Sequence, residues 1–103
     1  MDNSEILDSL SVTSTTRRPV GGTWVEGSIG GHTFSALVFE EHAACADYEL
    51  GDSRISKLSL RQEPTNSMVA CFDRGWDQRP GTEQASAIVD LLAAGLAETV
   101  FGR

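Results

Sequence analysis

The string Asp73-Arg74-Gly75-Trp76-Asp77 carries the densest group of side chains that could take part in recognition. Two carboxylates, a guanidinium and an indole surround a glycine directly after an alternating apolar run. Tryptophan and arginine are enriched at the energetic centres of protein interfaces. Polar residues at a strand end, beside a loop, are typical of recognition sites on a rigid scaffold. We therefore predict a partner-binding edge formed by Asp73, Arg74, Trp76 and Asp77.

The same string also has a purely structural interpretation. Arg74 could pair with Asp77 or Glu26 and stack on Trp76, which would fasten the strand to the loop that follows. Local ion pairs of this kind are common and individually weak. The sequence leaves both interpretations open.

The connection from residue 40 to residue 52 is the second candidate for partner binding. It holds five acids in 13 residues, namely Glu40, Glu41, Asp47, Glu49 and Asp52. Such a run could imitate a phosphate track and occupy the basic groove of a partner, or it could be a hydrated loop. Its spacing lacks the regular alternation of a calcium-binding EF-hand loop.

Metal and nucleophile chemistry have little support in the residue spacing. His42 and Cys45 form the one close pair among the histidines and cysteines, whereas structural zinc sites show paired short spacings. Cys71 falls in a predicted strand and Cys45 in an acidic loop, and neither setting stabilises a thiolate. Gly21-Gly22 and Gly30-Gly31 do not lead into helices, as a phosphate-binding loop would. We predict no enzyme activity, no cofactor and no metal.

Composition limits the classes of partner and the compartment. The chain has 103 residues, of which 40% are hydrophobic, and this length and composition suit one globular domain. Fifteen acids against eight bases give a net charge of −7, which opposes direct binding to nucleic acid. The N-terminus lacks the basic and apolar regions of a signal peptide, and no apolar run approaches the length of a membrane span. We predict a cytoplasmic protein with reduced cysteines and no membrane association.

Hydrophobic periodicity predicts the main elements of the fold. Period-two alternation indicates strands over 23–29, 32–39, 54–62 and 68–73, with Gly30-Gly31 as a hairpin turn between the first two. Apolar residues then recur at helical spacing from the N-cap candidate Thr82 to about residue 100. We predict an α+β domain, a four-stranded antiparallel β-meander with one C-terminal amphipathic helix packed on one face.

The two faces of the predicted sheet are both apolar. One face carries Phe34, Val38, Leu58, Leu60 and Phe72, and we expect the helix to pack on it through Ile88, Val89, Leu92 and Leu96. The second face is expected to carry Trp24, Leu37, Phe39, Ile55 and Val69, and to be covered by the N-terminal arm, a second subunit or a partner. Gly95 interrupts the helix, and a close approach of the helix to the sheet or to a second helix would explain it.

The N-terminal residues differ in composition from the rest. Residues 1–21 are rich in Ser, Thr, Asp and Asn, and we predict a flexible arm with one helical turn near residues 4–10. Residues 22–103 then form the single α+β domain.

Three stretches of the chain resemble a family of small bacteriophage- and prophage-encoded proteins. They are Trp24-Val25-Glu26-Gly27, Arg54-Ile55-Ser56-Lys57-Leu58 and Phe72-Asp73-Arg74-Gly75-Trp76-Asp77, in that order and spacing. The resemblance covers roughly residues 22–100. Phe72 stands where the family pattern favours tyrosine, so a role for a phenolic hydroxyl does not carry over. The resemblance implies a mobile-element setting, in which small acidic proteins bind and block host machinery.

These observations lead to a functional expectation with two rivals. We expect a non-enzymatic protein-binding module, an inhibitor of a bacterial defence complex of the anti-CRISPR type, whose partner is a host protein with a basic groove. The first rival is a small-ligand-binding or enzymatic domain, which requires a concave pocket with convergent polar groups near Arg74. The second rival is a structural homodimer that pairs the second apolar sheet face.

Overall fold

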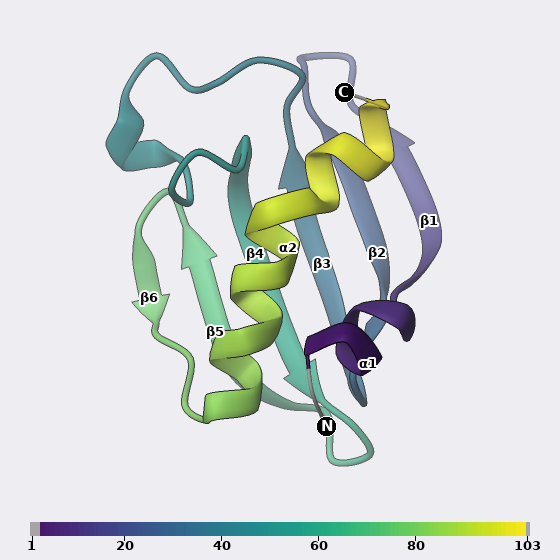
Figure 1. Cartoon of the computed structure of the whole chain (residues 1–103). Helices are drawn as coiled ribbons and strands as arrows, with labels where there is room; N and C mark the ends of the chain where they lie inside the picture. Colours follow the sequence, from purple (N-terminus) through teal and green to yellow (C-terminus); the bar gives the residue numbers. More distant parts are fainter. Residues whose placement is uncertain (1–2, 103) are drawn as a thin grey trace.

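The computed structural model describes residues 3–102, so residues 1–2 of the predicted arm and residue 103 lie outside the described part. Two helices and six strands follow one another along the chain (Figure 1). A 3₁₀ turn, Ala46–Tyr48, lies in the connection between β3 and β4. The elements are α1 (Asn3–Asp8), β1 (Ser11–Arg17), β2 (Thr23–Ile29), β3 (His32–Val38), β4 (Ile55–Gln62), β5 (Ser67–Asp73), β6 (Trp76–Gln78) and α2 (Glu83–Phe101).

The six strands form one antiparallel sheet in chain order, β1 to β6, and α2 crosses one face of it (Figure 1). The α+β class, the antiparallel sheet and the C-terminal helix are therefore confirmed. The prediction of four strands is wrong, because β1 and β6 extend the sheet at its two edges. All seven residues of β1 are exposed, so this strand carries no alternating apolar pattern that could reveal it.

The N-terminal segment is part of the folded sheet and core. Residues 11–17 pair with β2 from Ser11 opposite Ser28 to Arg17 opposite Thr23. Ile6 of α1 is buried and belongs to the core beneath α2. The segment predicted as an arm thus contributes a helix and an edge strand.

Turn chemistry sets the register of the central hairpins. Gly30 and Gly31 have φ values of 56° and 73°, which the two-residue turn between β2 and β3 requires and which glycine adopts without steric cost. The turn between β5 and β6 uses Arg74 and Gly75, with Asp73 N–H donating to the Gly75 carbonyl at 2.8 Å. The string predicted as a strand end is therefore a hairpin.

Two β-bulges change which side chains face the helix. The pairing of β3 with β4 shifts between Leu37 and Val38, and Ile55 consequently joins the core beneath α2. The pairing of β4 with β5 shifts between Leu60 and Arg61, and Val69 likewise joins that core. The prediction that Ile55 and Val69 face the opposite side is wrong, because a bulge inserts one residue and inverts the alternation.

α2 is capped at both ends and buries one face. Thr82 Oγ1 accepts a hydrogen bond from Ala85 N–H at 3.0 Å, and Gly102 ends the helix with a φ of 75°. By length and composition alone the helix is long and apolar enough to cross a membrane, and 33% of this stretch is buried inside the fold. Its buried residues are Ala85, Ile88, Val89, Leu92, Leu96 and Ala97.

Replacing Thr82 by alanine is expected to lower the free energy of unfolding by about 1 kcal/mol, because the Ala85 N–H loses its cap. Urea unfolding at neutral pH measures the loss. Thr82→Ser keeps the hydroxyl and should retain most of the stability. Equal losses in the two variants would contradict a capping role.

Candidate functional site

The connection between β3 and β4, here called loop 39–54, is anchored at both ends. Phe39 N–H donates to the Arg54 carbonyl at 2.9 Å, which extends the pairing of the two strands. Leu50 donates to the Ile55 carbonyl at 2.8 Å, and its side chain is buried in the core. The acidic loop is therefore a held surface element and not a free tether.

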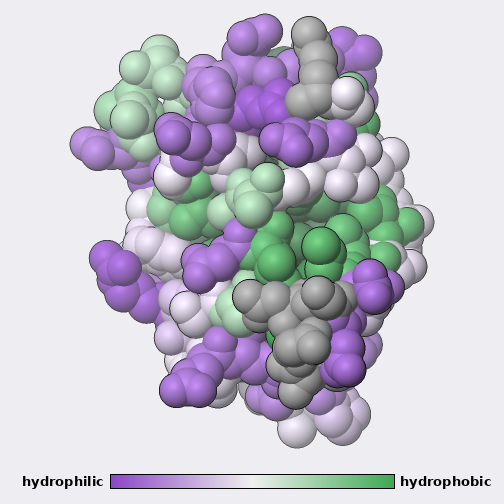
Figure 2. Space-filling model, in the orientation of Figure 1, coloured by the Kyte–Doolittle hydropathy of each residue, from purple (hydrophilic) through white to green (hydrophobic). Residues whose placement is uncertain are grey.

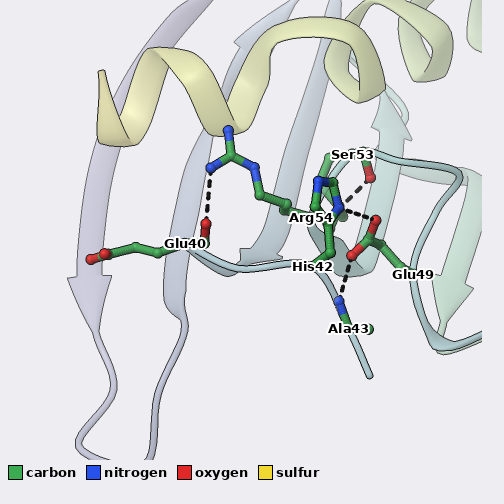
Figure 3. A network of polar contacts seen from close by, with 7 residues as sticks. Glu40, His42, Ala43, Glu49, Ser53 and Arg54 are labelled. Carbon is green, nitrogen blue, oxygen red and sulfur yellow. Dashed lines mark hydrogen bonds and ion pairs between the residues drawn. The ribbon is translucent and has the colours of Figure 1, made fainter. Parts of the chain in front are cut away.

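Glu49 is the polar centre of this loop (Figure 3). Its side chain is 6% exposed, and its Oε2 lies 2.8 Å from His42 Nδ1. Its Oε1 accepts a hydrogen bond from Ala43 N–H at 2.7 Å. Burial alone would raise the pKa of Glu49, but the bonds from His42 and from the Ala43 and Arg54 amides outweigh it and hold the pKa below 4.5.

This lowered pKa predicts a loss of stability in acid. The Glu49 contribution is fully present above the ordinary pKa of 4.5 and is lost as the pH falls through the lower pKa of the folded state. In urea unfolding, the free energy of unfolding of the wild-type protein should therefore fall as the pH is lowered from 7. The fall should be shallower in Glu49→Gln. Identical pH profiles for the two proteins would contradict the network.

The same residues could supply ligand atoms to a metal ion. A ring nitrogen of His42 and carboxylate oxygens of Glu49 and Asp52 lie within 4.8 Å of one another. The hydrogen bonds of Glu49 to His42 and Ala43 already explain its placement. We therefore attach no metal chemistry to the cluster.

A groove of about 360 Å³ separates loop 39–54 from the C-terminal half of α2, and we call it the acidic groove. Arg54 also borders it, and its Nη1 donates to the Glu40 carbonyl at 3.0 Å. In Figure 2, hydrophilic residues cross the upper part of this side, where Figure 1 places the loop and the last turns of α2. The acids that line the groove are Glu40, Glu41, Asp52 and Glu98, and the small residues from α2 are Ala93, Ala94, Gly95 and Ala97.

Gly95 lines this groove and contributes no side chain to it. Apart from its own helical turn, no described heavy atom lies within 4 Å of the position that a Cβ would occupy. The expectation that Gly95 permits a close approach to the sheet or to a second helix is therefore wrong within the described fold. The glycine opens space on the surface instead.

A second cavity, of about 450 Å³, borders the same loop, and we call it the arginine pocket. Leu37 contributes to its lining and alternates along β3 with Ala36 and Val38, which face the helix side. The pocket thus reaches the sheet face opposite α2. Its aromatic residues are Phe39 and Tyr48, and its cationic residues are Arg18, Arg54, Lys57 and Arg74.

Of the residues of the predicted partner-binding edge, Asp73 and Arg74 lie together, whereas Trp76 packs against the core. Arg74 lines the arginine pocket, with its guanidinium carbon 5.8 Å from the centre of the Tyr48 ring. Asp73 lies 3.7 Å from Lys57 Nζ, beside the pocket. Trp76 packs edge-on against Phe72 at 5.3 Å and borders the core, and Asp77 is exposed on β6.

The structural interpretation of Arg74, pairing with Asp77 or Glu26 and stacking on Trp76, does not match its contacts. Its Nε lies 3.9 Å from Asp73 Oδ1, whereas the guanidinium over Trp76 belongs to Arg79. Of the predicted acids, Glu41 and Glu49 line the arginine pocket, and Glu41 also lines the acidic groove. Asp47 is exposed in the 3₁₀ turn. The pocket near Arg74 is the feature that the small-ligand rival requires.

Sequence reasoning missed most of the arginine pocket. Arg18, Leu37 and Tyr48 carry no shared motif, and the β1–β2 turn, β3 and the loop bring them together only in three dimensions. Arg54 and Arg74 were visible as members of conspicuous strings, but nothing in those strings indicated a common cavity. In Cys71, burial first and then the charges of Asp77 and Asp73 raise the pKa of the thiol, which does not favour a nucleophile.

Comparison with known proteins places the chain in a family. A family model described as Domain of unknown function (DUF7678) matches residues 23–97, from the start of β2 into α2. The chain belongs to this family. No curated protein and no solved structure matches it.

Proposed function

We propose that this member of the DUF7678 family is a non-enzymatic binding module that receives a basic segment of a partner protein in the acidic groove. The observation that carries the proposal is a groove lined by four acidic residues and by a helical glycine whose Cβ position has no described neighbour within 4 Å. The acidic residues are Glu40, Glu41, Asp52 and Glu98.

Gly95 lowers the stability of α2 at its position. A glycine inside a helix is less stable than alanine by about 1 kcal/mol, and the described neighbours of Gly95 do not require it. A partner's main chain, or the aliphatic stem of a lysine or arginine, could lie against the bare helix backbone. The ammonium or guanidinium of that side chain would then reach the carboxylates on the groove walls.

The charge of the chain also favours a basic partner. The net charge of −7 attracts a cationic partner at long range, and the groove concentrates four acids where that partner would dock. Arg54 lies among these acids, and its hydrogen bond to the Glu40 carbonyl helps to hold loop 39–54 in place beside the groove. Association should therefore weaken as the salt concentration rises.

The identity of the partner is proposed from the family resemblance. We propose a cytoplasmic host protein of a bacterial defence complex, which is inhibited, as by an anti-CRISPR protein, when the basic segment that lines its groove is held in the acidic groove. Direct nucleic-acid binding is not part of the proposal. Self-association through the sheet face opposite α2 remains a prediction.

Two charge reversals in the groove test the proposal. Tagged wild-type protein and the Asp52→Lys/Glu98→Lys variant are incubated with lysate of a bacterium that carries its defence systems, and bound proteins are quantified by mass spectrometry. The groove variant is expected to lose at least about tenfold in capture of the stoichiometric partner, because attraction becomes repulsion at two positions.

The matched control reverses acids outside the groove. Asp47 and Asp90 are exposed on the same loop and helix but do not line the groove, so Asp47→Lys/Asp90→Lys changes the net charge equally. We expect this control variant to capture as much of the partner as the wild-type protein does. Equal capture by the two variants would overturn the groove as the binding site.

A further inference from the structure

We propose that the arginine pocket binds a small ligand that joins an anionic group to an aromatic or branched aliphatic body. The anionic group is a carboxylate or a phosphate. This proposal goes beyond the acidic groove and does not depend on it. Glu41, His42 and Arg54 border both cavities, but Arg18, Phe39, Tyr48, Lys57 and Arg74 line the arginine pocket and not the groove.

Cations are concentrated in this pocket against the overall charge of the chain. Arg18, Arg54, Lys57 and Arg74 are four of the eight basic residues in a chain with 15 acids. They come from three separate stretches of the sequence, with Arg54 and Lys57 three residues apart, so no single charge run explains their meeting. A site with these donors favours an anion.

Arg18 Nε donates to the Gly21 carbonyl at 2.8 Å and Arg54 Nη1 to the Glu40 carbonyl at 3.0 Å, whereas Lys57 and Arg74 have only long ion pairs among the described residues. Asp73 lies 3.7 Å from Lys57 Nζ and 3.9 Å from Arg74 Nε, both longer than a charge-assisted hydrogen bond. Glu49 also lines the pocket, but its two carboxylate oxygens accept hydrogen bonds from His42 and from the Ala43 N–H. Glu41 stands where the pocket meets the acidic groove.

The pocket also offers apolar surface to the body of a ligand. The guanidinium of Arg18 lies 6.0 Å from the centre of the Phe39 ring, and that of Arg74 lies 5.8 Å from the Tyr48 ring. Leu37 is almost fully buried, whereas Tyr48 is 52% exposed. Two arginine–aromatic pairs beside a leucine can hold a flat or branched group while the cations contact its charge.

Backbone strain points to the same residues. Three described non-glycine residues have positive φ, namely Arg54 at 64°, Asn66 at 60° and Arg74 at 54°. Asparagine adopts this conformation readily, but arginine does so seldom. Both strained arginines line the pocket, and the Arg74 N–H donates to the Ser56 carbonyl at 2.8 Å, which fixes the turn. Strain of this kind clusters at binding sites.

The test uses phenyl phosphate as the probe and the full chain labelled with ¹⁵N. We expect saturable amide shifts near Leu37, Phe39, Tyr48 and Arg74, with a dissociation constant of about 1 mM or tighter for a ligand of this size. Arg74→Gly removes the guanidinium and suits the positive φ, so it should fold at least as well as wild type. It should bind phenyl phosphate at least about tenfold more weakly.

Control ligands and a control variant make the result decisive. Arg79→Gly removes the arginine that lies over Trp76, outside the pocket, and should leave the affinity unchanged. Phenol lacks the anion and inorganic phosphate lacks the apolar body, so both should bind more weakly than phenyl phosphate. Equal affinity for either control ligand, equal losses in the two variants, or no saturable shift at about 10 mM ligand would overturn the proposal.

Discussion

Gly27→Ala is expected to lower the free energy of unfolding by about 2 kcal/mol. A Cβ at Gly27 would collide with the backbone carbonyl of Ser11 on β1 and would meet the Phe34 ring at 3.0 Å. The first contact is with backbone, so relief requires β1 to move away from β2. This variant therefore tests whether the N-terminal segment belongs to the sheet.

Gly81→Ala is the matched control for this experiment. Its nearest neighbour, the Val69 carbonyl, would lie 3.9 Å from the new Cβ, which is ordinary contact. Its stability should stay within about 0.5 kcal/mol of wild type in urea unfolding. If Gly27→Ala were as stable as this control, β1 would not pair with β2 as described.

Glu49→Ala is expected to lower the free energy of unfolding by about 2 kcal/mol. The substitution removes a nearly buried carboxylate and leaves the Ala43 and Arg54 amides and the His42 ring without their acceptor. Loop 39–54 borders both cavities, so its loosening should weaken binding at both. Urea unfolding and hydrogen exchange at the Ala43 amide measure the two effects.

Asp47→Ala provides the comparison on the same loop. Asp47 is exposed, and its replacement should change stability by no more than about 0.5 kcal/mol. Unchanged protection of the Ala43 amide in Glu49→Ala would contradict the role of Glu49 as the anchor of the loop.

The sequence predicted the elements whose burial leaves a periodic pattern. The central strands and α2 place apolar residues at period two and at helical spacing, so burial on one side is visible in the residues themselves. β1 is an exposed edge strand without such a pattern, and β6 is only three residues long. Both strands are specified by pairing with a neighbour, which a single strand's sequence does not display.

The residues of the two cavities were also predictable only in part. Arg74 and the acids of loop 39–54 stood out because their residue types are conspicuous. Their partners Arg18, Leu37 and Tyr48 are ordinary in sequence and become a pocket through the sheet register and the course of the loop. Bulges placed Ile55 and Val69 on the helix side, because one inserted residue breaks the alternation between the two sides of the bulge. Gly95 was recognised as unusual, but it leaves open space in a groove and does not permit a close packing contact.

An NMR titration tests the central claim, that the acidic groove receives a basic segment. ¹⁵N-labelled full chain is titrated with a short peptide rich in lysine and arginine, and with a peptide in which glutamates replace these residues. We expect saturable shifts from the basic peptide centred on Ala94, Gly95 and Glu98 and on the facing acids of the loop, and none from the acidic peptide. Shifts spread evenly over all exposed acids, or centred away from Gly95, would contradict the claim.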